Sequence, residues 1–202
     1  MPYTPDIQQK RIEYFLHSIK DKKNCTVLDI GCQTGYVCQR LYELGHDAYG
    51  IEVLEKSIAT AKKKYPQIHF KVANCQEKIP FDNNFFDIVW AGDVIEHIAF
   101  TDVFVNEINK VLKNGGLFIL TTPMHNMLKN IIISLFNFEK HFDPEFPHLR
   151  FYTIKSLESV LKKRGFDIKT KKYIGRIYPL AKTMFVVAEK TEDKQVYSKH
   201  RY

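Results

Sequence analysis

The stretch Val27-Leu28-Asp29-Ile30-Gly31-Cys32-Gln33-Thr34-Gly35 decides the fold. An apolar run ends in an acidic residue and a glycine turn, and a helical pattern begins directly afterwards. About twenty residues later, Tyr49-Gly50-Ile51-Glu52 forms a second short strand pattern that ends on a carboxylate. This order predicts a nucleotide-type ligand across the first two strands of an open α/β sheet. The glycines would let the backbone approach the ligand, and Glu52 would accept hydrogen bonds from both ribose hydroxyls.

Hydrophobic periodicity extends this unit into an alternating series of strands and helices. The expected strands are 26–30, 48–52, 68–72, 85–90, 117–122, 166–174 and 183–189, and the expected helices are 6–20, 36–44, 56–65, 101–112 and 153–163. Such alternation is typical of an α/β fold with a doubly wound, mostly parallel sheet. Only a short loop joins the last two strands, so we expect seven strands with the last one antiparallel.

The chain of 202 residues is expected to form one domain over residues 1–190. A long connection at 123–152 interrupts the alternation, and we expect it to serve as a lid or acceptor-binding insert. Its segment 130–138 is strongly apolar, which allows three interpretations: a lid over the active site, a membrane contact or a subunit interface. The polar residues 191–202 are expected to form a frayed tail.

Composition limits the possible partners. The net charge is +7, but the lysines occur in short groups that suit a solvated face better than a nucleic-acid footprint, which argues against a nucleic-acid partner. No apolar run approaches the length of a transmembrane segment, and the N-terminus does not resemble a signal peptide. The four cysteines lack C-x-x-C spacing, which argues against zinc and suits reduced thiols. We expect a cytoplasmic monomer or homodimer without a metal.

The glycine turn also selects among nucleotide-type ligands. A dinucleotide site requires G-x-G-x-x-G, whose second glycine admits the pyrophosphate. Here Gln33 occupies that position between Gly31 and Gly35, and the charge of Asp29 would repel a diphosphate. Both observations favour a ligand with a nucleoside but no phosphate. S-adenosylmethionine fits, because Glu52 would bind its ribose and its cationic sulfonium and amino groups tolerate a nearby carboxylate.

At this point the sequence resembles the class I methyltransferases, which use S-adenosylmethionine on a seven-stranded sheet. The segments that carry the resemblance, in order, are VLDIGCQTG (27–35), GIEVLEKSIATAKKKYP (50–66), ANCQEKIPFDNNFFDIVWAGDVIEHI (73–98), VLKNGGLFILTTP (111–123) and DPEFPHLRFYTIKSLESVLKKRGF (143–166). The last segment is similar to small-molecule members of the family. The resemblance departs from the family pattern at Gln33, where glycine is usual, and at Asn74, which is often aspartate.

The resemblance implies a cofactor site and an S-adenosylmethionine-dependent methyltransferase that modifies oxygen or nitrogen of a small-molecule acceptor. The implied cofactor residues are Asp29, Gly31, Cys32, Gly35, Glu52, Val53, Asn74, Cys75 and Asp93. Within this set, the amide oxygen of Asn74 would accept a hydrogen bond from the adenine amino group.

Methyl transfer is an in-line displacement, so the protein mainly supplies proximity and alignment. A hydroxyl or protonated amine acceptor would also need a base, and His97, His125 and His148 are the candidates. Each of these histidines could instead be held by local hydrogen bonds without a catalytic role.

Two alternatives stay open. Asp93, Glu96, His97 and His148 resemble a subgroup of the family that uses a divalent metal to methylate the 3′-terminal ribose 2′-hydroxyl of small RNAs. Alternatively, the chain is a non-catalytic scaffold that binds S-adenosylmethionine or nothing, for which Gln33 and Asn74 are the support.

Overall fold

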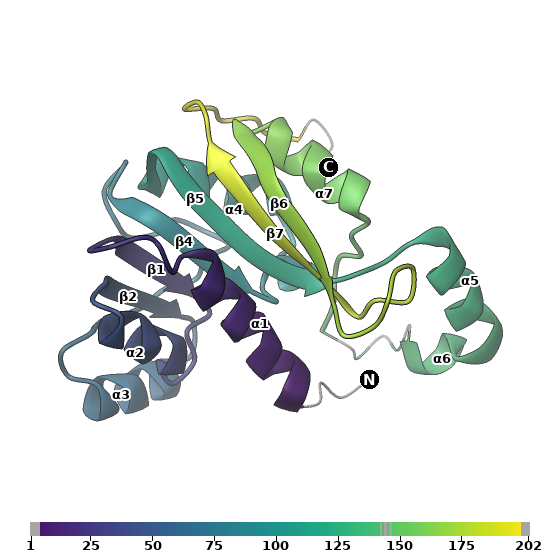
Figure 1. Cartoon of the computed structure of the whole chain (residues 1–202), viewed down its shortest axis with the longest axis horizontal. Coiled ribbons are helices and arrows are strands. Elements are labelled where there is room, and N and C mark those ends of the chain that lie inside the picture. Colours follow the sequence, from purple (N-terminus) through teal and green to yellow (C-terminus); the bar gives the residue numbers. More distant parts are fainter. Residues whose placement is uncertain (1–4, 142, 144, 146, 199–202) are drawn as a thin grey trace.

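The computed structural model describes residues 5–141, 143, 145 and 147–198, and its strands form one seven-stranded sheet (Figure 1). The strands are β1 (Thr26–Ile30), β2 (Asp47–Glu52), β3 (His69–Val72), β4 (Phe86–Gly92), β5 (Leu112–Pro123), β6 (Phe166–Ile174) and β7 (Thr183–Lys190). Their order is β3-β2-β1-β4-β5-β7-β6, and β7 runs antiparallel to both of its neighbours. The predicted doubly wound α/β fold with an antiparallel last strand is confirmed.

Helices cover both faces of the sheet and bury two apolar clusters. The helices α1 (Pro5–Ser18), α2 (Tyr36–Glu43) and α3 (Glu55–Lys64) supply one cluster, which includes Phe15, Cys38 and Ile58. The helices α4 (Thr101–Val111) and α7 (Ile154–Lys162) supply the other, which includes Phe104 and Leu157. Their apolar residues recur at helical spacing, so each helix buries one stripe against the sheet.

Two strand boundaries differ from the sequence prediction by more than one residue. Strand β5 begins at Leu112 rather than at residue 117, because Leu112 already pairs with Phe86; the register shifts across Asn114-Gly115-Gly116, and pairing resumes with Leu117 opposite Ile88. Strand β4 continues to Gly92 rather than stopping at residue 90. Asp93 therefore directly follows the carboxyl end of β4, and the short 3-10 helix η1 (Ile95–His97) begins two residues later.

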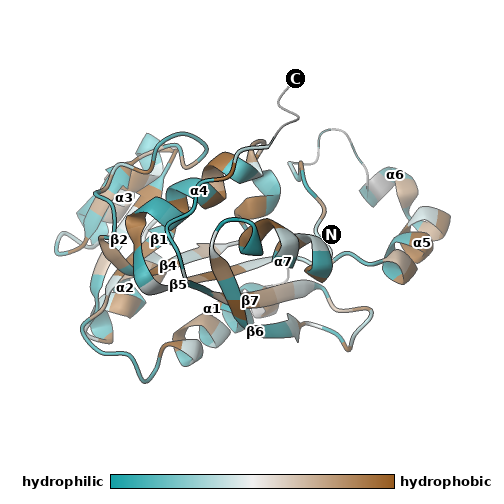
Figure 2. Ribbon diagram, turned by 90° about the horizontal axis from the view of Figure 1, so that it is seen from above, coloured by the Kyte–Doolittle hydropathy of each residue, from teal (hydrophilic) through white to brown (hydrophobic). Residues whose placement is uncertain are grey.

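The connection after β5 contains helices α5 (Met127–Phe136) and α6 (Phe138–His141), which project away from the sheet (Figures 1 and 2). Helix α5 has no buried residue, and Phe136 at its end is 83% exposed. Asn126 caps the helix by accepting a hydrogen bond from the Lys129 amide at 2.9 Å. Residues 142, 144 and 146 of this connection lie outside the described residues.

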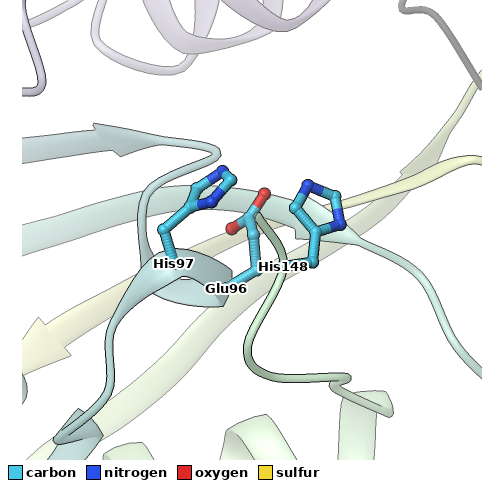
Figure 3. Close-up of side chains that lie close together, drawn as sticks. All are labelled: Glu96, His97 and His148. Atoms are coloured by element: carbon cyan, nitrogen blue, oxygen red, sulfur yellow. The ribbon is translucent and has the colours of Figure 1, made fainter. Parts of the chain in front are cut away.

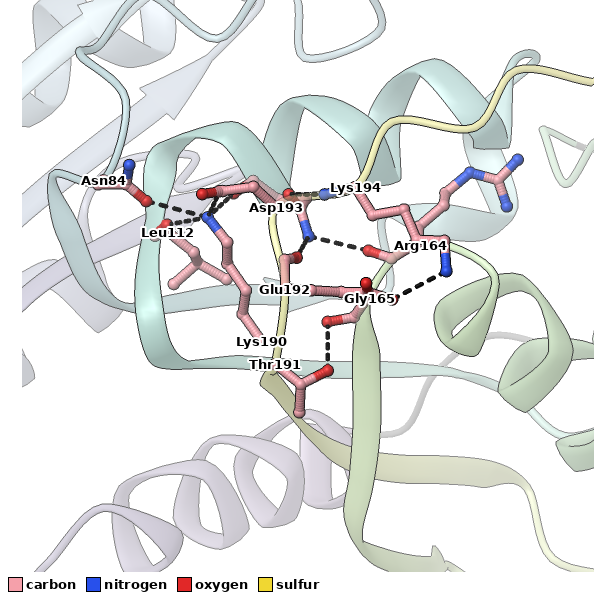
Figure 4. Close-up of polar contacts among 10 residues, drawn as sticks. Asn84, Leu112, Arg164, Gly165, Lys190, Thr191, Glu192, Asp193 and Lys194 are labelled. Atoms are coloured by element: carbon pink, nitrogen blue, oxygen red, sulfur yellow. Dashed lines mark hydrogen bonds and ion pairs between the residues drawn. The ribbon is translucent and has the colours of Figure 1, made fainter.

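The predicted frayed tail is wrong for residues 191–198, which are held against α4. The Asn106 side chain bonds both backbone groups of Val196, at 3.2 and 3.1 Å, and the Ser198 amide donates to Asp102 at 2.8 Å. Figure 4 shows the neighbouring contacts, in which the fully buried Lys190 ammonium donates to the carbonyls of Asn109 and Leu112 at 2.7 Å. Polar composition predicted fraying, but buried asparagines on α4 bind the tail backbone. Residues 199–202 lie outside the described part of the chain.

Candidate active site

The glycine turn closes onto the carboxyl end of β2. The amides of Gly31 and Cys32 both donate to the Ile51 carbonyl, at 2.9 and 3.1 Å. Gly35 has a φ of +85°, and a Cβ there would lie 2.6 Å from the Phe70 ring. Gln33 also adopts a positive φ, of +48°. Glycine adopts this left-handed conformation without the strain that a side chain causes. This explains why glycine is usual in the family at the position that Gln33 occupies here.

Glu52 lies at the end of β2 and joins the two strand ends. One carboxylate oxygen accepts hydrogen bonds from the amides of Val53 and Leu54 at 2.8 and 3.2 Å. The other accepts from the Gln33 amide of the glycine turn at 3.3 Å. A carboxylate has about four acceptor positions, so one is left for a ligand hydroxyl, and the long bond to Gln33 could yield a second. The carboxylate is thus oriented before any ligand binds.

Asp29 is buried beneath the turn, with 3% of its surface exposed. Burial raises the pKa of Asp29 to about 8; the hydrogen bond from Cys38, at 3.6 Å, opposes the shift and the charge of Glu52 adds to it. The carboxyl group is therefore mainly neutral at pH 7. The expected repulsion of a diphosphate by Asp29 is correspondingly weak, and Asp29 acts on the turn chiefly by packing below it.

A cavity of about 100 Å³ lies between the glycine turn and α1. Arg11 of α1 lines it and forms an ion pair with Asp93 at the end of β4. Asp93 has a φ of +54° and also accepts a hydrogen bond from the Thr121 hydroxyl at 2.7 Å. Sequence reasoning missed Arg11. The available signal was its spacing, because Arg11 lies four residues from both Ile7 and Phe15 on the buried face of the helix.

The remaining predicted cofactor residues continue along the same edge of the sheet. Val53 follows Glu52 and is exposed. Asn74 follows β3, and its amide oxygen accepts a hydrogen bond from the Gln76 amide at 3.1 Å while its nitrogen donates to Glu77. Burial raises the pKa of the neighbouring Cys75 thiol to about 11. A larger hollow, of about 620 Å³, lies beside edge strand β3 and contains none of the predicted site residues.

Two of the three candidate bases lie together. The rings of His97 and His148 have centroids 4.8 Å apart, and the Glu96 carboxylate lies between them (Figure 3). The ligand atoms of these three side chains all lie within 4.8 Å of one another, so they could hold a metal ion. Asp93, the fourth member of the metal set considered from the sequence, instead pairs with Arg11.

Burial dominates the electrostatics of this cluster. It raises the pKa of Glu96 to about 7 and lowers that of His148 to about 4, with the charge of His97 acting in the same direction on His148. At neutral pH the His148 imidazole is therefore neutral.

His125 lies in a second group, between the end of β5 and α5. Its Nδ1 lies 3.0 Å from the Asn130 amide oxygen, and its ring contacts Phe151 at a centroid distance of 4.8 Å. Burial lowers the pKa of His125 to about 4. His141, which sequence reasoning did not select, lies 5.5 Å from His125 between ring centroids. No periodicity indicated this contact, because His141 belongs to the irregular connection.

Comparison with known proteins agrees with this geometry. The sequence model of a family described as "Methyltransferase domain" matches residues 28–120. The chain is 31% identical over 128 residues to the ubiquinone biosynthesis O-methyltransferase of Bradyrhizobium diazoefficiens, covering 61% of this chain and 50% of that protein. Its identity to the human mitochondrial enzyme of the same name is 28% over 162 residues, which cover 75% of this chain and 43% of that enzyme.

A solved S-adenosylmethionine-dependent methyltransferase from Mesorhizobium loti superposes with a TM-score of 0.70 at 16% identity, covering 88% of this chain and 97% of that one. Residues 28–120 thus match the methyltransferase domain family, and the chain shares the fold of the solved methyltransferase. The chain spans about half the length of the curated methyltransferases that it matches. Within the described residues, every helix is too short or too polar to span a bilayer.

Proposed function

We propose that this chain is an S-adenosylmethionine-dependent methyltransferase that modifies an oxygen or nitrogen atom of a small molecule. One observation carries the proposal: Glu52 is held by backbone amides at the end of β2, directly beside the glycine turn that closes β1. Ligands of open α/β sheets bind at these carboxyl ends. The match of residues 28–120 to a methyltransferase domain supports the same ligand.

The proposed cofactor contacts follow from the positions of the side chains. Glu52 binds the ribose, and Asn74 accepts from the adenine amino group with the lone pair left beside its bond to Gln76. Arg11 supplies a positive charge for the carboxylate of the methionine part, and Asp93 accepts from its amino group. The cavity of about 100 Å³ beside Arg11 would take only the methionine part, because Glu52 and Asn74 lie outside its lining.

S-adenosylmethionine supplies the activated methyl group, and the residues of the chain align the acceptor and manage its proton. The acceptor lies at the ends of β4 and β5, where His97 and His148 lie together and His125 lies in a second group. Burial keeps His148 neutral at pH 7, as a base must be, and its pKa of about 4 makes it a weak one. The relatives named O-methyltransferases favour a hydroxyl acceptor over an amine.

Helix α5 is assigned to the acceptor side of the site. Its apolar residues are exposed in this conformation, and closing them over an acceptor would exclude water from the reaction. Deletion of residues 127–138 should then weaken acceptor turnover without weakening cofactor binding. Unchanged turnover would leave a membrane contact or a subunit interface as the purpose of α5. A cytoplasmic monomer or homodimer stays a prediction.

Calorimetric titration with S-adenosylmethionine and S-adenosylhomocysteine tests the proposal most directly. We expect both to bind at one site, and transfer of a labelled methyl group to a panel of phenols, alcohols and amines should follow. Absence of binding by either compound would contradict the proposal and favour the scaffold alternative. The comparisons give no support to that alternative or to the RNA 2′-O-methyltransferase alternative.

A further inference from the structure

We propose that a hollow between α1 and the loop that joins β6 to β7 binds a nucleoside monophosphate, a ligand that the proposed function does not use. This α1–β6 hollow has a volume of about 530 Å³, and ligand pockets are typically about 300–1,000 Å³. Its lining shares no residue with that of the cofactor cavity. The lining residues that carry the argument are Tyr14 of α1, Lys172 and Tyr173 of β6, and Arg176 and Tyr178 of the loop.

The aromatic side chains of the α1–β6 hollow are the first argument. The ring centroids of Tyr173 and Tyr178 lie 5.1 Å apart, and the Tyr14 ring packs 6.0 Å from that of Phe185 on β7. Tyr178 is 56% exposed and Tyr14 is 37% exposed, so both rings present open surface. A nucleic-acid base has a flat π-face that stacks on aromatic side chains. These rings therefore suit a planar base.

The charges beside these rings are the second argument. The Lys172 ammonium lies 5.4 Å from the centroid of the Tyr14 ring, and Arg176 lines the same hollow. No described carboxylate belongs to the lining. Lys171, the neighbour of Lys172 on β6, instead forms an ion pair with Glu158 at 2.8 Å. Lysine and arginine are the usual partners of phosphate groups, so two cations beside aromatic surface fit a base that carries a phosphate.

The loop that carries Arg176 and Tyr178 is held in place on both sides. The Lys182 amide donates to the Ile174 carbonyl at 3.0 Å, which closes the loop where β6 ends and β7 begins. The side-chain amide of Asn126, at the start of α5, donates to the Pro179 carbonyl at 2.7 Å. Ordering a loop on binding costs affinity, and a loop that is already held avoids most of that cost.

Calorimetric titration of the full chain with GMP, guanosine and inorganic phosphate tests the site. GMP is the probe because the proposed cofactor site takes adenine. We expect one site for GMP and weaker binding of guanosine and of phosphate. Tyr178→Ala should weaken GMP binding by about 5- to 150-fold, the range for the loss of one stacked base. Tyr42→Ala, an exposed tyrosine on α2, is the matched control.

A charge variant tests the phosphate contact separately. The double variant Lys172→Gln and Arg176→Gln should bind GMP and guanosine with nearly equal affinity, since each exposed charge pair contributes up to about fivefold. The double variant Lys169→Gln and Lys171→Gln removes the same charge from the same strand and should still prefer GMP. Circular dichroism melts of all variants establish that lost binding does not reflect unfolding.

The outcomes separate this inference from the proposed function. Wild-type protein that binds GMP no more tightly than guanosine, or Tyr178→Ala protein that binds GMP as tightly as the Tyr42→Ala control, would overturn the site. Displacement of GMP by S-adenosylhomocysteine would also overturn it, because GMP would then occupy the cofactor site. Single-stranded RNA that binds more tightly per nucleotide than GMP would replace the mononucleotide by a nucleic-acid strand. GMP binding without S-adenosylhomocysteine binding would contradict only the proposed function.

Discussion

Replacement of Glu52 by glutamine is the sharpest test of the cofactor site. The carboxylate uses three of its roughly four acceptor positions on the amides of Gln33, Val53 and Leu54. At least one acceptor position is therefore left for a hydrogen bond from a ribose hydroxyl. A hydrogen bond to a charged group contributes about 1.5–3 kcal/mol, which corresponds to about a 10- to 150-fold change in Kd. We expect Glu52→Gln to weaken S-adenosylhomocysteine binding by at least this factor.

A cycle with altered ligands separates the ribose contact from the effect on the turn, because the amide of glutamine also disturbs the bond to Gln33. The 2′-deoxy and 3′-deoxy analogues of S-adenosylhomocysteine are titrated against both proteins. In the wild type, at least one analogue should bind about 10- to 150-fold more weakly than the parent ligand. In Glu52→Gln the same analogue should lose less affinity, since the charged partner of the hydroxyl is already replaced by a weaker, neutral acceptor.

Glu55→Gln provides the control, because Glu55 is an exposed carboxylate in the first turn of α3 and its replacement changes the net charge equally. It should bind S-adenosylhomocysteine as the wild type does. If Glu52→Gln also binds as tightly as the wild type, or if neither hydroxyl contributes to the affinity of the wild type, the ribose assignment is wrong. The proposed position of the cofactor would then have no support from this residue.

Three further predictions concern stability. Burial raises the pKa of Asp29 to about 8. Between about pH 4 and 8 the folded state therefore keeps this proton, whereas the unfolded state releases it. The free energy of unfolding should fall as pH rises through that window, by on the order of a few kcal/mol. Urea unfolding of Asp29→Asn should therefore depend less on pH, and an unchanged pH profile would refute the shift. Gly35→Ala should lower the free energy of unfolding by about 1–3 kcal/mol, because of the positive φ and the contact with Phe70, and a neutral effect in urea would show that the turn adapts. Asn106→Ala should cost about 2–3 kcal/mol and increase amide exchange at Val196, whereas unchanged exchange there would mean that other contacts hold the tail.

The sequence by itself determined the alternation of strands and helices, the glycine turn and the position of Glu52. These features depend on local patterns: apolar residues recur at the period of a strand or helix, and a turn needs particular residues at adjacent positions. The tertiary structure changed what local pattern had suggested about Asp29, because its burial beneath the turn makes a predicted anion largely neutral.

Only the tertiary structure decided the contacts between distant segments. Arg11 of α1 meets Asp93 at the end of β4, and η1 meets the segment of His148 through backbone hydrogen bonds from the irregular connection. The tail binds α4 through Asn106, although its composition favours solvent. Periodicity reports which face of an element is apolar, but it does not report which polar groups a loop brings together. Those pairings follow from the path of the chain, because a buried polar group is stable only where the fold supplies its partner.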